Sequence, residues 1–164
     1  MKLAAYKGTR SGHYGILNRV GRVLDTGAHS HTEIVFSDGM SASSAPGEGV
    51  RFKRIAYSTP NAWDFINLPP ALEPQARQWY IDHEGHDYDM LGNVRFCLGF
   101  IPQNPSKWFC SESGAAALGL PEPHRYGPSG LVILSEFIFK LGRSDTPWTN
   151  SVILTGNTHE SYHS

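Results

Sequence analysis

The residue best suited to chemistry in this sequence is Cys110, which lies in the stretch WFCSESGAAALG (residues 108–119). Small, helix-forming residues follow it and Gly119 ends them, so we predict a helix that begins near Cys110. Free N–H groups and the helix dipole at such a start favour a thiolate, and the same groups, Ser111 first, could stabilise an oxyanion. The alternative is a buried and inert thiol, because free cysteines are among the most buried residues.

The sequence holds one other cysteine, Cys97, in the apolar stretch RFCLG (residues 95–99). No polar companion accompanies it in that pattern, so we interpret Cys97 as a packing residue. Two cysteines in 164 residues do not make a disulfide scaffold.

A nucleophilic cysteine needs a base, usually a histidine that a third polar group holds in place. Among the eight histidines, His31 opens the β-rich stretch HTEIVF (residues 31–36). Residues i and i+2 of a strand point to the same face, so Glu33 would lie beside His31 and could orient its imidazole. The alternative reading is a half-exposed edge strand with ordinary polar residues.

A zinc site is a second possible use of the same strand. His29, His31 and Glu33 would share one face and are all residue types that bind zinc. The stretch HEGHD (residues 83–87) does not fit the metalloprotease motif, because its second histidine comes one residue early.

The remaining pattern predicts an α+β protein with its strands early and its helices late. Alternation and turn signals predict an antiparallel meander in the middle of the chain, and a helical period replaces them after Pro69-Pro70. The expected strands are 2–7, 32–36, 40–44, 50–55 and 63–68. The expected helices are 13–24, one from Pro74 to Gly85, one capped by Asp87 or Asp89 that carries Met90 to Leu98, and 110–119. A last apolar segment runs from Pro128 to Phe139.

Length and composition predict one domain, residues 1–143, followed by a polar tail, residues 144–164. The formal net charge of −1 gives no electrostatic footprint for nucleic acid. No stretch approaches the roughly 20 apolar residues of a membrane span, and the start of the chain does not resemble a signal peptide. We therefore expect a cytoplasmic protein, or a virion-associated one if a phage encodes it.

Several stretches, taken in order, resemble one known family over roughly residues 10–135. They are SHTEIVF (30–36), DG (38–39), SAS (41–43), GVRFK (49–53), Trp63, INLP (66–69), YD (88–89), LG (91–92) and WFCSE (108–112). This succession resembles the circularly permuted NlpC-type papain-like cysteine peptidases, in particular the YiiX-like group of bacteria and phages. Permutation places the histidine before the cysteine, as here and as in the similar lecithin retinol acyltransferase. His29 departs from the pattern, in which an aromatic residue often precedes the Ser-His pair.

The resemblance implies a papain-like core, in which an antiparallel sheet that carries the histidine packs against the helix of the cysteine. On this basis Cys110 is the nucleophile, His31 the general base and Glu33 the third polar residue, with Ser43 as the alternative. The function expected is a cysteine hydrolase that cleaves an amide bond without a cofactor, and the family suggests peptidoglycan peptides as its substrate class. The alternatives are an acyltransferase or lipid-amide hydrolase of the same fold and a non-catalytic virion or scaffold protein.

Overall fold

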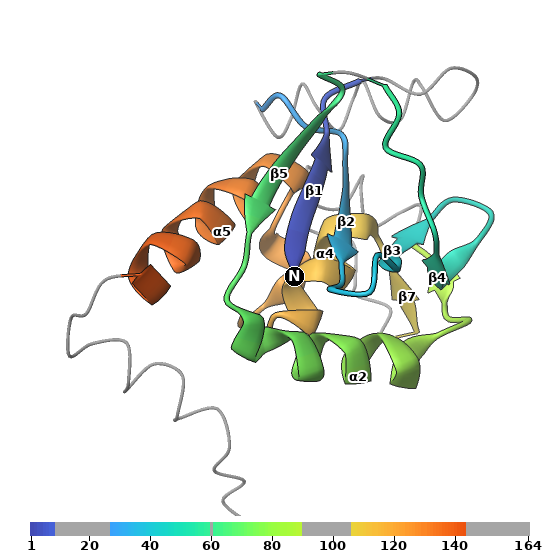
Figure 1. The fold of residues 1–164 in the computed structure, drawn as a ribbon. Coiled ribbons are helices and arrows are strands. Elements are labelled where there is room, and N and C mark those ends of the chain that lie inside the picture. The colour runs from blue at the N-terminus through green and yellow to red at the C-terminus, as the bar shows by residue number, and fades with distance from the viewer. Residues whose placement is uncertain (9–26, 60, 90–105, 144–164) are drawn as a thin grey trace, which may run out of the picture.

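The computed structural model describes residues 1–8, 27–59, 61–89 and 106–143, and these form a mixed α+β fold (Figure 1). Its centre is a five-stranded antiparallel sheet in the order β4-β3-β2-β1-β5. The strands are β1 (Lys2–Tyr6), β2 (His31–Val35), β3 (Ser41–Ala45), β4 (Gly49–Lys53) and β5 (Trp63–Asn67). The predicted α+β class and the antiparallel sheet are therefore confirmed.

Tight turns connect the strands that form the predicted meander. The β2–β3 turn contains Gly39 at φ 79° and the β3–β4 turn contains Gly47 at φ 78°. Both values lie in the left-handed region, which glycine enters without steric cost.

The meander prediction is correct for β2 to β4 but wrong for β5. This strand does not continue beside β4; it pairs with β1 at the opposite side of the sheet, where Leu3 is the register partner of both Ile34 and Ile66. These three apolar side chains thus lie in one row on one face, and burying that row fixes the register.

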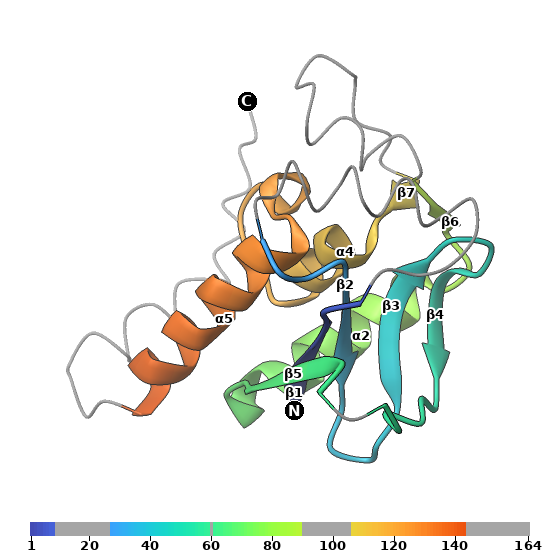
Figure 2. The same cartoon turned by 90° about the horizontal axis from the view of Figure 1, so that it is seen from above.

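Three helices cover one face of the sheet, as Figures 1 and 2 show: α2 (Glu73–His83), α4 (Cys110–Ala117) and α5 (Pro128–Arg143). Short 3-10 turns precede α2 (Pro70–Leu72) and α5 (Pro123–Arg125). One hydrophobic cluster joins the sheet to the helices. It contains Leu3, Ala5, Ile34, Ala42, Val50 and Ile66 from the strands, with Ala76, Tyr80, Ala115, Ala117, Leu131 and Val132 from the helices.

A second, two-stranded sheet leads the chain into α4. It pairs β6 (Asp87–Tyr88) with β7 (Lys107–Trp108) in parallel. Asp87 is therefore part of a strand, which leaves Asp89 as the predicted cap of a helix whose residues lie outside the described ranges. The Val50 N–H group donates to the His86 carbonyl oxygen at 2.9 Å, which ties this small sheet to β4.

Some predicted elements lie outside the described residues. These are the helices 13–24 and Met90 to Leu98, with Cys97 inside the second, and the tail 144–164. Within the described ranges, no helix has both the length and the apolar character that crossing a membrane requires.

Candidate active site

Cys110 is the first residue of α4, as the sequence predicted. The helix start is fixed locally, because the Phe109 N–H group donates to the Glu112 carboxylate at 3.3 Å and the Ser113 hydroxyl donates to the Cys110 carbonyl oxygen at 2.9 Å. Gly114 faces Leu131 so closely that a Cβ atom would lie 3.0 Å from that side chain. Its small size thus allows α4 to approach α5.

The start of α4 packs where β2 and β3 separate. The ladder between these strands has only two register pairs, Ile34 with Ala42 and Val35 with Ser41. Beyond it, the Thr32 carbonyl oxygen accepts a hydrogen bond from the Ser43 hydroxyl at 2.7 Å. The Thr32 N–H group interacts with the thiol of Cys110 and lowers its pKa. The opening between the strands therefore brings the helix start to the sheet.

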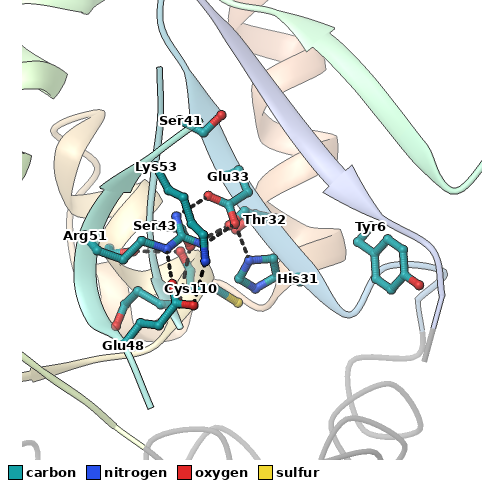
Figure 3. A network of polar contacts seen from close by, with 12 residues as sticks. Tyr6, His31, Thr32, Glu33, Ser41, Ser43, Glu48, Arg51, Lys53 and Cys110 are labelled. Atoms are coloured by element: carbon teal, nitrogen blue, oxygen red, sulfur yellow. Dashed lines mark hydrogen bonds and ion pairs between the residues drawn. The ribbon is translucent and has the colours of Figure 1, made fainter. Parts of the chain in front are cut away.

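His31 lies between Cys110 and Glu33, as Figure 3 shows. The His31 Nε2 atom lies 2.7 Å from Glu33 Oε1, and the imidazole also interacts with the Cys110 thiol, which raises the pKa of the imidazole. Since Nε2 is engaged by the carboxylate, Nδ1 is the ring nitrogen left for the sulfur. Ser43, the alternative third residue, bonds to the Thr32 carbonyl, so it is Glu33 that contacts the imidazole.

Charge in this cluster favours a thiolate and an imidazolium. Burial raises the pKa of Cys110, but the charge and hydrogen bond of His31 and the N–H groups of Thr32 and Ser111 outweigh it and lower that pKa. Burial likewise opposes a charged His31, yet Cys110 and then Glu33 raise the pKa of the imidazole to about 9. These shifts both favour the form of the pair in which the proton is on the imidazole.

Glu33 remains ionised although its side chain is 0% exposed. Burial alone would raise its pKa, but hydrogen bonds from Arg51 and His31 lower the pKa to about 2. The guanidinium of Arg51 binds both carboxylate oxygens at 2.7 Å and continues to Glu48 at 2.9 Å. The polar cluster thus runs from Cys110 through His31 and Glu33 to Arg51.

The reacting groups are nearly covered, with 4% of Cys110 and 5% of His31 exposed. The buried hydroxyls of Thr32 and Ser111 have no hydrogen-bond partner among the described residues. On the face of the sheet away from the helices, a cavity of about 300 Å³ reaches Glu33, Arg51 and Trp63.

Aromatic side chains lie beside this cavity and next to the imidazole. The Trp63 ring stands edge-on to His31 with the ring centres 6.4 Å apart, and it also contacts Tyr6 and Tyr57. This face of the sheet therefore offers apolar contact surface close to the base.

The zinc alternative fails because its three residues do not converge. His29 lies before β2 and its Nε2 atom bonds to Asp64 of β5 at 2.9 Å, whereas His31 bonds to Glu33. The alternation expected of a strand does not extend back to His29, since the strand begins at His31. Across the described residues, no three histidine, cysteine or acidic side chains form a possible metal site.

Arg51 is the member of the cluster that sequence reasoning missed. It lies opposite Ser43 in the β3–β4 ladder, on the same face as Glu33. A usable signal was present, because Glu33 directly precedes the apolar residues Ile34 and Val35 in a strand and a buried carboxylate requires a cation.

Comparisons with models of protein families, with curated proteins and with solved structures found no match to this chain.

Proposed function

We propose that this chain is a cysteine hydrolase that cleaves an amide bond through a thioester intermediate. The observation that carries the proposal is that His31 contacts Glu33 at 2.7 Å and lies beside the Cys110 thiol (Figure 3). Nucleophilic cysteines in hydrolases require such a base and such an orienting group. The resemblance to permuted NlpC-type peptidases also supports this proposal. With it we propose that the fold is a permuted papain-like core.

In the proposed reaction, the Cys110 thiolate attacks the carbonyl carbon of the substrate and forms a C–S bond. N–H groups at the start of α4, including that of Ser111, are the proposed donors to the oxyanion. The C–N bond then breaks and the amine leaves with the proton of the His31 imidazolium. His31 next removes a proton from water, the resulting hydroxide displaces sulfur from the thioester, and the acid is released.

The substrate class that we propose is the peptide of peptidoglycan. The test is digestion of purified peptidoglycan by the full chain and by Cys110→Ala, with products identified by mass spectrometry. We expect new amine and carboxyl ends with the wild type and none with the variant, whose side chain cannot form a thioester.

Two other results would reject amide hydrolysis. Products that carry an acyl group on an added amine or alcohol, without free acid, would indicate an acyltransferase. A wild type that yields no product and no acyl adduct on Cys110 would favour the non-catalytic scaffold.

A further inference from the structure

Arg51 lies on the opposite side of Glu33 from His31 (Figure 3). Its two terminal nitrogens donate to the two carboxylate oxygens at 2.7 Å each, and its Nε–H group donates to Glu48 at 2.9 Å. This two-point contact fixes the plane of the carboxylate as well as its charge. Oε1 thereby stays aligned with the imidazole, at 2.7 Å from Nε2 of His31.

Glu33 depends on this contact because its side chain has no exposure to water. A carboxyl group without water and without a cation takes up a proton. A protonated Glu33 would no longer stabilise a positive charge on His31, and an imidazole without that charge would no longer stabilise the Cys110 thiolate.

We propose that Arg51 is a positioning residue, which holds Glu33 as an oriented carboxylate and through it keeps His31 protonated and Cys110 ionised. This inference rests on the proposed function and deepens it, since it assigns a fourth residue to the same site. Arg51 itself does not touch the reacting atoms.

The other charged and titratable groups around the cluster do not replace Arg51. Lys53 follows it on β4, but its amine bonds to Glu48 at 2.8 Å. Tyr57, after β4, pairs with the Ser41 hydroxyl, and Tyr80, from α2, pairs with the Ser113 hydroxyl. Burial raises the pKa of both phenols, Tyr57 to about 12, so both are neutral. Lys53 is therefore a suitable control: a neighbouring cation without a bond to Glu33.

The direction in which the pKa of His31 changes when Arg51 is removed distinguishes positioning through Glu33 from a direct charge effect on His31. If Arg51 acted on His31 only as a nearby cation, its removal would raise the pKa of the imidazole. If it acts through Glu33, its removal lowers the pKa of His31 and raises that of Cys110.

The experiment uses the full chain with Arg51→Met, Lys53→Met and Glu33→Gln. Iodoacetamide alkylation of Cys110 is followed by mass spectrometry of its peptide from pH 5 to pH 10, and the pKa of His31 is followed by NMR. We expect Arg51→Met to raise the apparent pKa of Cys110 by about 1, which slows alkylation about tenfold below that pKa. For Lys53→Met we expect a change below about twofold, because Lys53 does not contact Glu33.

The double variant Arg51→Met/Glu33→Gln tests whether Arg51 acts through Glu33. We expect it to match Glu33→Gln alone, because the effect of Arg51 has no other route. Three results would overturn the proposal. One is a loss of alkylation rate in the double variant that equals the sum of the two single losses. The others are a higher pKa of His31 in Arg51→Met and an alkylation profile of Arg51→Met within twofold of the wild type.

Arg51→Lys keeps the test valid if Arg51→Met does not fold, which circular dichroism would reveal. Lysine keeps the charge but loses the two-point contact, so we expect slower alkylation than in the wild type, and an unchanged profile would count against positioning. Alkylation needs no substrate. A wild type that cleaves nothing would reject the proposed function alone, whereas cleavage with an unchanged Arg51→Met profile would reject only the role of Arg51.

Discussion

His31 has two tasks at different stages of the proposed reaction, and its protonation decides which one it can perform. In the resting protein the imidazolium stabilises the thiolate, and during cleavage it must give its proton to the leaving amine. Its pKa of about 9 keeps this proton available at neutral pH. Cys110 has a lowered pKa, so it remains a thiolate when His31 loses the proton. Hydrolysis and simple thiol reactivity should therefore differ in alkaline solution.

We predict that hydrolysis falls as the pH rises through about 9, whereas alkylation of Cys110 does not fall. The acid that protonates the amine disappears over that range, while the thiolate stays. Both rates are measured between pH 6 and pH 10.5 on the same preparation. In His31→Ala the apparent pKa of alkylation should move up toward that of a free cysteine, roughly 8.5. Hydrolysis that stays constant beyond pH 10 would contradict the assignment of His31 as the acid.

At the residue scale, sequence reasoning was accurate where it relied on local geometry. The period of a strand predicts that His31 and Glu33 share a face, and the structure has them in contact at 2.7 Å. Arg51 was not predicted because its contact with Glu33 depends on pairing across two hairpins. His29 was wrongly grouped with His31, since Asp64, which holds it, is 35 residues away in the sequence.

The link between β4 and the β6–β7 sheet fixes the approach of the chain to Cys110. Gly49 opens β4 at φ 69°, where a Cβ atom would clash with the His86 carbonyl oxygen. That carbonyl lies next to β6, which pairs with the strand that ends at Trp108. A glycine is therefore required at position 49 for its conformation and also for its lack of a side chain.

We predict that Gly49→Ala lowers the free energy of unfolding much more than Gly47→Ala does. Both glycines are left-handed, but a Cβ atom on Gly47 would meet nothing within 4 Å. The left-handed conformation alone costs about 1 kcal/mol in Gly47→Ala, and the added backbone clash should bring Gly49→Ala to about 3 kcal/mol. Urea unfolding of both variants measures the difference. Equal losses would show that the contact with His86 has no energetic role.

At the element scale, the strands of the main sheet and the helices α2 and α4 follow from local signals, whereas β6 and β7 were not predicted. Strand-forming residues between Gly-containing turns gave β2 to β4, and Pro74 and the small residues after Cys110 marked the two helices. The pairing of β5 with β1 could not be derived this way, because nothing local distinguishes the free edge of β1 from that of β4. Burial of the row through Leu3 and Ile66 decides it.

The whole molecule places a hydrophobic core on one face of its sheet and a buried ionic cluster on the other. The contribution of the core to stability does not depend on pH, whereas the contribution of the ionic cluster does. The pKa of Glu33 is about 2 in the folded protein against an ordinary value of 4.5, because Arg51 and His31 outweigh the effect of burial. The unfolded chain therefore binds a proton at higher pH than the folded one, and stability rises with pH between these values. The contribution of His31 to stability changes with pH in the opposite direction. Its raised pKa stabilises the fold at low pH, and this contribution is lost as the pH rises through about 9.

We predict that the stability gap between the wild type and Glu33→Gln narrows as the pH falls from about 4.5 toward 2. The wild type loses the contribution of the ionised carboxylate in this range, whereas the amide has no proton to gain. Urea unfolding at half-unit steps from pH 2.5 to pH 7 measures the gap. Glu84→Gln, at an exposed position, is the matched control, and its gap to the wild type should stay nearly constant. A Glu33→Gln gap that is equally constant would mean that Glu33 is already protonated in the folded protein, and the ionised chain from Arg51 to Cys110 would then not exist.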